Sequence, residues 1–375
     1  MKIQFKNTPE QIELVKAMGS KDNKVSREAT EIFAAFIAPV IQQVINVAGT
    51  SSKIYTDLNY NEDDSPSIPL DLYYNEDVGY VSTWSQSIAG GLPSSQVEGV
   101  KEMKVSTYRL DSAVHMLKKY ARRSRLDVVA KTVEKMAQEI LVKQERNAWA
   151  VILKALAEAS TQTQQHVVQS ATDDVFIVAD LSELMTRIRR INAAFNGGSS
   201  ATAPGEGLTD LYVSPEIKEQ IRNFAFNPMN TRVGPTVAGS TLANYTATTA
   251  IALPDAIREE IFRSAGSSEI YGVNITELLE LGTARRYNLL FSEFAGSTSY
   301  DGATFSGAND EILVGFDLSR ESFLRPIAQN ADSGATLTTQ VDDQWVARSE
   351  KLGWYASLEE GRICVDSRAT CGIIV

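Results

Sequence analysis

The chain of 375 residues is poor in the side chains that most enzymes use for chemistry. It holds two histidines, His115 and His166, and two cysteines, Cys364 and Cys371. Neither histidine has sequence neighbours that would complete a metal site or activate a nucleophile. We therefore expect no catalytic residue, no metal site and no cofactor. Two cysteines make no disulfide framework, and we expect free thiols, although a disulfide across a terminal hairpin or between subunits stays open.

Motifs for binding phosphate or activating a substrate are also missing. The sequence contains no phosphate loop, dinucleotide glycine fingerprint, HExxH or GxSxG. The glycine-rich residues 197–207 lack the lysine that a phosphate cradle needs. Adjacent carboxylates do occur, but an acidic chain produces such pairs by chance: Asp63–Asp64, Asp173–Asp174, Glu259–Glu260, Asp342–Asp343 and Glu359–Glu360.

Positive charge and long apolar runs are scarce. The formal net charge is −11 and the pI is about 4.9, which is the wrong sign for a protein that grips nucleic acid. No run approaches the length of a membrane span, and the start MKIQFKNTPEQ lacks the apolar core of a signal peptide. We therefore expect a protein that folds in a reducing cytoplasm and has no membrane partner.

A very long helix is the strongest positive signal, from about Ser124 to Ala159. Apolar residues recur there at spacings of three and four, and the stretch contains neither glycine nor proline: Leu126, Val129, Val133, Met136 and Ile140 begin the series. At 1.5 Å per residue, the helix would be roughly 50 Å long. Such a length indicates a bundle, a coiled coil or an elongated subunit, since the charged residues exclude a membrane span.

The segments before this helix are expected to bury little by themselves. The pattern of residues 1–50 predicts two amphipathic helices. Thr8 would cap the first helix, and Pro39 would kink or end the second. Together they would form an arm that lies on another surface. From about Thr50 to Tyr108, short alternating runs separated by Asn, Asp, Pro and Gly predict β-hairpins. A long excursion of this kind generally rests on another part of the assembly.

The remainder predicts a mixed α/β region followed by strands. In LYVSPEIKEQIRNFA, a strand leads into a helix that Ser214 caps and Pro215 begins. Residues 288–292 are a further strand candidate, and EILVGFDLSRESFLRPIA predicts a strand pair. The last forty residues predict a β-meander.

This order of segments resembles the major capsid protein of tailed bacteriophages, the Hong Kong 97-type fold. The resemblance implies an α+β fold with an N-terminal arm, an extended β-loop, a peripheral domain with a long spine helix, and an axial domain. The limits are 1–50 for the arm, 51–107 for the loop, 108–178 and 332–375 for the peripheral domain, and 179–331 for the axial domain. LYVSPEIKEQIRNFA is similar to the entry of the axial domain.

The resemblance also implies a structural role rather than an enzymatic one. Copies would form hexamers and pentamers of an icosahedral head shell around double-stranded DNA, without sequence-specific binding. A separate scaffolding protein, a portal and decoration proteins are the implied partners. The chain would be assembled in the cytoplasm of the bacterial host and end in the virion. An encapsulin-like compartment shell is the alternative in the same architecture, and an α/β enzyme is the alternative from another class.

Two charge clusters predict a contact between subunits. The acidic residues lie in the loop, and the basic residues lie just before the long helix: Glu62, Asp63, Asp64, Glu76 and Asp77, against Lys118, Lys119, Arg122, Arg123 and Arg125. They either pair across a subunit boundary or are two solvated clusters. Reversing Arg122 and Arg123 to glutamate distinguishes the two possibilities. Assembly of the shell should fail if the clusters pair, and should be unimpaired if both are solvated.

Overall fold

The computed structural model describes residues 8–69, 102–159, 165–172, 174–195, 207–223, 269–330, 334–342 and 350–375. Helices and sheets both form in these residues, which confirms the predicted α+β class. The chain divides into two compact units. Unit 1 comprises Met1–Ile68, Glu102–Trp149 and Phe323–Ile363, and unit 2 comprises Pro69–Lys101, Ala150–Ser322 and Cys364–Val375.

Unit 1 is built on a sheet whose central strand is β14 (Lys351–Glu360). On one side β14 pairs antiparallel with β4 (Tyr108–Leu117) along its whole length, and on the other side with β13 (Leu337–Val341). At Glu360 it meets β12 (Phe323–Gln329), and β1 (Thr56–Asn61) runs parallel to β12 at the edge of the sheet. A short two-stranded sheet joins β2 (Ser67–Pro69) and β3 (Glu102–Lys104).

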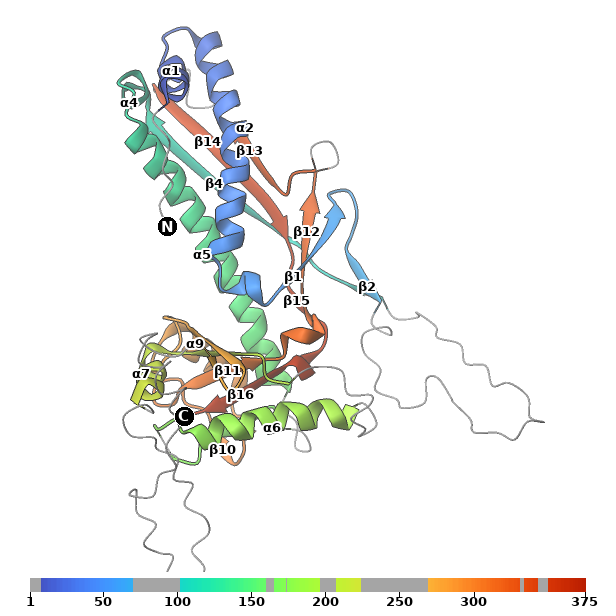
Figure 1. Ribbon diagram of the computed structural model, residues 1–375. Coiled ribbons are helices and arrows are strands. Elements are labelled where there is room, and N and C mark those ends of the chain that lie inside the picture. Colours follow the sequence, from blue (N-terminus) through green and yellow to red (C-terminus); the bar gives the residue numbers. More distant parts are fainter. Residues whose placement is uncertain are drawn as a thin grey trace, which may run out of the picture. The chain divides into compact units, whose positions relative to one another are not determined.

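Helices cover one face of this sheet: α1 (Pro9–Met18), α2 (Asn23–Ala48) and the first part of α5 (Leu126–Ala159) lie across β4, β13 and β14 (Figure 1). Thr8 caps α1, as predicted, by accepting a hydrogen bond from the backbone N–H of Gln11. The Phe33 ring of α2 packs 5.5 Å from that of Trp354. Both helices therefore bury apolar side chains in unit 1 itself, whereas the sequence predicted an arm on another surface.

Pro39 lies inside α2 and does not end it. The helix is held on both sides of the proline by buried residues, Ile37 before it and Ile41 after it, which belong to the core of unit 1. Packing of the apolar face thus outweighs the hydrogen bond that proline removes.

The predicted long helix is confirmed as α5 (Leu126–Ala159), which follows the short helix α4 (Lys118–Arg122). Val129, Val133 and Met136 are buried in the core of unit 1. The last ten residues of α5 belong to unit 2, where Ile152 and Leu156 are also buried. One helix therefore supplies apolar side chains to both units.

Unit 2 contains a six-stranded sheet in the order β5 (Val167–Gln169), β16 (Thr370–Ile374), β11 (Ile312–Phe316), β6 (Asp210–Val213), β8 (Val273–Glu277) and β7 (Glu269–Ile270). Every residue of β11 and β16 is buried. Helix α6 (Val178–Phe195) packs on β16 (Figure 1). Gly372 allows close packing, because a Cβ there would lie 3.0 Å from Cδ2 of Leu156.

Helix α7 (Pro215–Asn223) begins as the sequence predicts, since the Ile217 N–H donates to Ser214 Oγ at 3.0 Å. The predicted strand at residues 288–292 is wrong, because these residues lie in helix α9 (Arg286–Ala295). The last residues also depart from a single meander. β13 and β14 join the sheet of unit 1, whereas β16 pairs with β5 and β11 in unit 2. Residues 364–375 therefore belong to unit 2, and the preceding residues back to Phe323 belong to unit 1.

Candidate assembly site

The two strands that frame the predicted loop begin and end at one place in unit 1, which we call the loop root (Asp57–Asn61 and Thr107–Tyr108). Tyr60 donates its hydroxyl hydrogen to Glu359 Oε1 at 3.1 Å. Thr107 Oγ1 donates to the same carboxylate oxygen at 2.7 Å. One side chain of β14 therefore holds both the outgoing and the returning strand.

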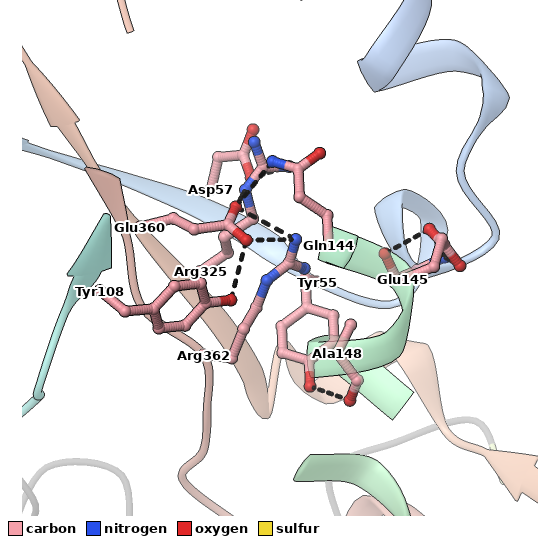
Figure 2. A network of polar contacts seen from close by, with 10 residues as sticks. Tyr55, Asp57, Tyr108, Gln144, Glu145, Ala148, Arg325, Glu360 and Arg362 are labelled. Atoms are coloured by element: carbon pink, nitrogen blue, oxygen red, sulfur yellow. Dashed lines mark hydrogen bonds and ion pairs between the residues drawn. The ribbon is translucent and has the colours of Figure 1, made fainter. Parts of the chain in front are cut away.

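The neighbouring carboxylate, Glu360, is fully buried and forms the centre of a polar network (Figure 2). Tyr108 Oη donates to its Oε1 at 2.9 Å, and Gln144 Nε2 of α5 donates to its Oε2 at 3.0 Å. Arg325 Nε and Arg362 Nη2 form ion pairs with Oε2 at 3.2 and 3.3 Å. Removing one partner from such a network typically costs about 3–5 kcal/mol, because the other charges stay buried.

Two acidic side chains face two basic ones in this network. Arg325 also reaches Asp57 of β1, with Nη1 at 3.4 Å from Oδ1. The guanidinium of Arg362 lies over the ring of Tyr55, 4.7 Å from its centroid. A hollow of about 200 Å³ beside Arg325 is lined in part by Asp57, Asn59 and Gln144.

Burial shifts the titration of the groups around Glu360. Burial, with the nearby Glu360 carboxylate, raises the pKa of Tyr108 to about 12, so the phenol stays a hydrogen-bond donor. Burial also lowers the pKa of the Arg325 guanidinium, and attraction by Glu360 opposes this effect. The network is therefore charged but internally compensated, as a structural network requires.

Helix α5 holds the chain that leads into the loop root. The Glu145 carboxylate accepts hydrogen bonds from the backbone N–H and the hydroxyl of Ser51, at 3.1 and 2.7 Å through Oε1. Tyr55 donates its hydroxyl hydrogen to the Ala148 carbonyl at 3.0 Å, and Trp149 Nε1 donates to Thr50 Oγ1 at 3.1 Å. A Cβ at Gly49 would lie 2.6 Å from Glu145 Oε1, so a larger residue there would displace this carboxylate.

The structure describes three of the five acidic residues that were predicted to contact a neighbouring subunit. Glu62, Asp63 and Asp64 form an exposed turn directly after β1, which we call the acidic turn. The Glu62 N–H donates to the Gln329 carbonyl at 3.2 Å, and the Asp64 N–H to the Asn61 carbonyl at 2.9 Å. Glu76 and Asp77 lie outside the described residues.

The basic residues differ in the contacts that they form within the chain. Lys118 is buried, and burial, with the nearby charge of Arg122, lowers its pKa. Arg122 Nε donates to the Gly19 carbonyl at the end of α1 at 2.8 Å, and Arg125 forms an exposed ion pair with Asp127 at 2.9 Å. Lys119 and Arg123 are exposed as well, and Lys119 Nζ lies 5.2 Å from the centroid of the neighbouring Tyr120 ring. Because Arg122 and Arg125 are held by the contacts above and Lys118 is buried, Lys119 and Arg123 are the best placed of the five for a contact with another molecule.

The acidic turn and α4 follow strands that are not neighbours in the sheet of unit 1. β1 leads into the acidic turn and pairs with β12, whereas β4 leads into α4 and pairs with β14. Three strand spacings therefore separate the two clusters by roughly 14 Å or more within one chain. A pairing between them would therefore have to join two copies.

The side chains with reactive groups do not gather in one place. His115 is exposed on β4, and buried His166 lies with Nδ1 2.9 Å from the Thr370 carbonyl oxygen. Cys364 and Cys371 are both free, and burial raises the pKa of both thiols. In the described part of the chain, no group of three or more His, Cys, Asp or Glu residues could hold a metal ion. No helix in that part is long and apolar enough to cross a membrane.

Comparisons with known proteins find likeness in structure and none in sequence. No family model and no curated protein matches the chain. The capsid of cyanophage P-SCSP1u matches with 13% identity and a TM-score of 0.48, over 86% of this chain and 85% of that one. Microbacterium phage Oxtober96 matches with 10% identity and a TM-score of 0.48, over 87% and 90%.

An encapsulin, SrpI of Synechococcus elongatus, matches with 10% identity and a TM-score of 0.37, over 73% of this chain and 75% of that one.

Proposed function

We propose that this chain is the structural subunit of an icosahedral phage head, a major capsid protein of the Hong Kong 97 type. Copies assemble into hexamers and pentamers around double-stranded DNA. The observation that carries this proposal is the order of elements. A helical arm covers a sheet, an excursion leaves and returns at the loop root, and α5 runs from the first unit into the second. The chain then returns to the first sheet through β12, β13 and β14.

The surface of unit 1 supports a role in assembly. Ile32 and Phe36 on the outer side of α2 are 60% and 47% exposed, and Leu58 on β1 is 39% exposed. Large apolar side chains at such exposure are typical of surfaces that meet a partner when they gather on one element. The net charge of −11 suits the wall of a container whose nucleic acid must not adhere to it.

The implied partners follow from the same proposal. A separate scaffolding protein would direct assembly in the host cytoplasm, a portal would occupy one vertex, and decoration proteins would bind outside. The arm, loop, peripheral and axial limits given from the sequence belong to the proposal as well. No membrane and no cofactor takes part.

Electron microscopy of the purified full chain, alone and co-expressed with a scaffolding protein, tests the proposal directly. We expect shells, tubes or capsomers. A uniform population of small particles with monomer mass under both conditions would contradict it. The encapsulin alternative predicts shells that hold an enzyme cargo instead of DNA, and the α/β enzyme predicts turnover of a metabolite.

We further propose that the acidic turn contacts the exposed residues of α4 and its C-terminal side in a neighbouring copy. Residues Glu62, Asp63 and Asp64 would meet Lys119 and Arg123, with Arg122, Arg125 and Lys118 behind them. Glu76 and Asp77 belong to the same proposed contact. Each exposed pair contributes only about 0.2–1 kcal/mol, but a shell repeats the contact at every subunit boundary.

The variant K119E/R123E separates this contact from a merely solvated charge. It avoids Arg122, whose reversal would also remove the hydrogen bond to Gly19. We expect folded, soluble subunits that fail to assemble, because like charges would then face each other. Mixing with E62K/D63K/D64K subunits should restore assembly. K131E/K135E, which reverses two exposed lysines on α5, is the matched control, and equal assembly of all variants would refute the contact.

A further inference from the structure

Strand β1 is held with little help from burial. Five of its six residues are exposed, and Tyr60 is the one that is half-buried. Its backbone pairs in parallel with β12 from Thr56 to Asn61. A strand at the edge of a sheet, with both faces largely in solvent, is weakly fixed by packing, so its direction depends on its polar contacts.

Glu359 supplies such a contact on one face of β14. Its Oε1 accepts hydrogen bonds from Tyr60 at 3.1 Å and from Thr107 at 2.7 Å. These donors come from the strands that leave and re-enter unit 1. A backbone hydrogen bond from the Val105 N–H to the Pro66 carbonyl, at 3.0 Å, joins the same two segments further out.

Glu360 supplies contacts on the opposite face, because successive side chains of a strand alternate. Its carboxylate binds Tyr108 at the start of β4 and Arg325 of β12. Arg325 in turn reaches Asp57 at the start of β1. Two consecutive carboxylates therefore hold the loop root from both sides of the sheet. Figure 2 shows the side chains of Tyr108 and Arg325 pointing toward the Glu360 carboxylate.

We propose that Glu359 and Glu360 form a positioning clamp that fixes the direction in which β1 carries the acidic turn, and so presents Glu62, Asp63 and Asp64 to a neighbouring copy. The acidic turn begins two residues after Tyr60, which leaves no room for a flexible spacer. The role of a neighbouring copy rests on the proposed function, whereas the contacts of the clamp all lie within one chain. Glu359 is the part that can be tested without disturbing the buried charges.

The double variant Y60F/T107V removes both donors to Glu359 and leaves the shapes of the two side chains almost unchanged. The matched control is Y355F, which removes a hydroxyl that accepts from Arg109 Nη2 at 3.0 Å on the same sheet, away from the loop root. Amide hydrogen exchange is measured on subunits kept below the assembly concentration. Assembly yield is then measured by light scattering and microscopy.

We expect amide exchange in residues 58–67 to be roughly tenfold faster in Y60F/T107V than in wild type, since two hydrogen bonds are lost. Exchange in α5 should be unchanged, and assembly should slow by a similar factor. Y355F should match wild type in both measurements. Unchanged exchange at the loop root would overturn the clamp. Faster exchange with normal assembly would overturn its role in presenting the acidic turn. If wild-type subunits never assemble, the proposed function fails, and the exchange measurement still decides whether the clamp exists.

Discussion

Unit 1 and unit 2 bury their sheets in different ways. In unit 2, β11 and β16 are buried along their whole length, and their sequences ILVGF and TCGII are nearly continuous apolar runs. In unit 1, β4 alternates between exposed and half-buried residues along most of its length. The centre of the sheet in unit 2 is thus covered on both faces, although β7 and β8 carry exposed residues, whereas the sheet of unit 1 has one covered face and one face that is partly open to solvent.

The sheet of unit 1 carries charged side chains on its open face and at its contact with α5. The open face of unit 1 carries Arg109, Asp111 and Tyr355, and Glu360 and its arginines lie where the strands meet α5. A surface of this kind can form contacts between copies without first unfolding. The difference between the two sheets predicts that equivalent substitutions in them have unequal effects.

The same truncation in the two sheets should have the most unequal effects. Leu313→Ala in β11 removes a side chain that is 0% exposed and should lower the free energy of unfolding by about 2–5 kcal/mol. Leu117→Ala in β4 removes one that is 38% exposed and should cost less than about 1 kcal/mol. Denaturant unfolding of the two variants checks this. Equal losses would mean that the open face is covered in the free subunit.

Glu360→Gln should be the most damaging polar change in unit 1. It leaves Arg325 and Arg362 buried with no full negative charge between them, and we expect a loss of about 3 kcal/mol. Glu359→Gln is the control, since it keeps an acceptor for Tyr60 and Thr107 and should cost under about 1 kcal/mol. Similar losses for both would show that Glu360 contributes no more than an ordinary hydrogen-bond acceptor.

The counterpart in unit 2 is Glu311, a buried carboxyl that forms no ion pair with any of the residues the structure describes. Burial, with repulsion from Glu216, raises the pKa of Glu311 to about 7, although hydrogen bonds from Ser214 oppose the shift. A carboxyl with a raised pKa in the folded state favours folding most below its unfolded pKa of about 4.5 and loses that contribution as pH rises through 7.

We therefore expect the stability of unit 2 to fall by on the order of 2–3 kcal/mol between about pH 4.5 and pH 7 through this group alone. Glu311→Gln should remove that part of the pH dependence. Unfolding curves of the wild type and the variant across this range, with local exchange in β11 as the probe, measure the difference. Parallel curves for the two proteins would show that folding does not shift the pKa of Glu311.

Local patterns in the sequence predicted the elements better than they predicted the contacts. The spacing of Val129, Val133 and Met136 gave α5 to within two residues, and Ser214 with Pro215 gave the start of α7. Residues 288–292 were misassigned because a short apolar run fits a strand or a helix equally. The helical spacing shows only when Tyr287, Phe291 and Ala295 are taken together.

The polar network around Glu360 could not be predicted from the sequence, because its residues are far apart along the chain. Asp57, Arg325 and Glu360 come from three distant segments that the pairing of β1, β12 and β14 brings together, and the packing of α5 adds Gln144. In sequence, Glu359–Glu360 was one of several adjacent carboxylate pairs. The acidic turn and α4 could be found by charge alone, but their distance within one chain required the pairing of β4 with β14.

The smallest effect is expected on the open face itself. Tyr355 accepts a hydrogen bond from Arg109, and Arg109 donates to Asp111 at 2.9 Å. The hydroxyl of Tyr355 and then Arg109 hold the pKa of Asp111 below its ordinary value. All three groups remain close to water, so Tyr355→Phe should change the free energy of unfolding by no more than about 0.5 kcal/mol. A loss of several times that size in the isolated subunit would mean that this face is an internal surface, and the contrast with the sheet of unit 2 would then disappear.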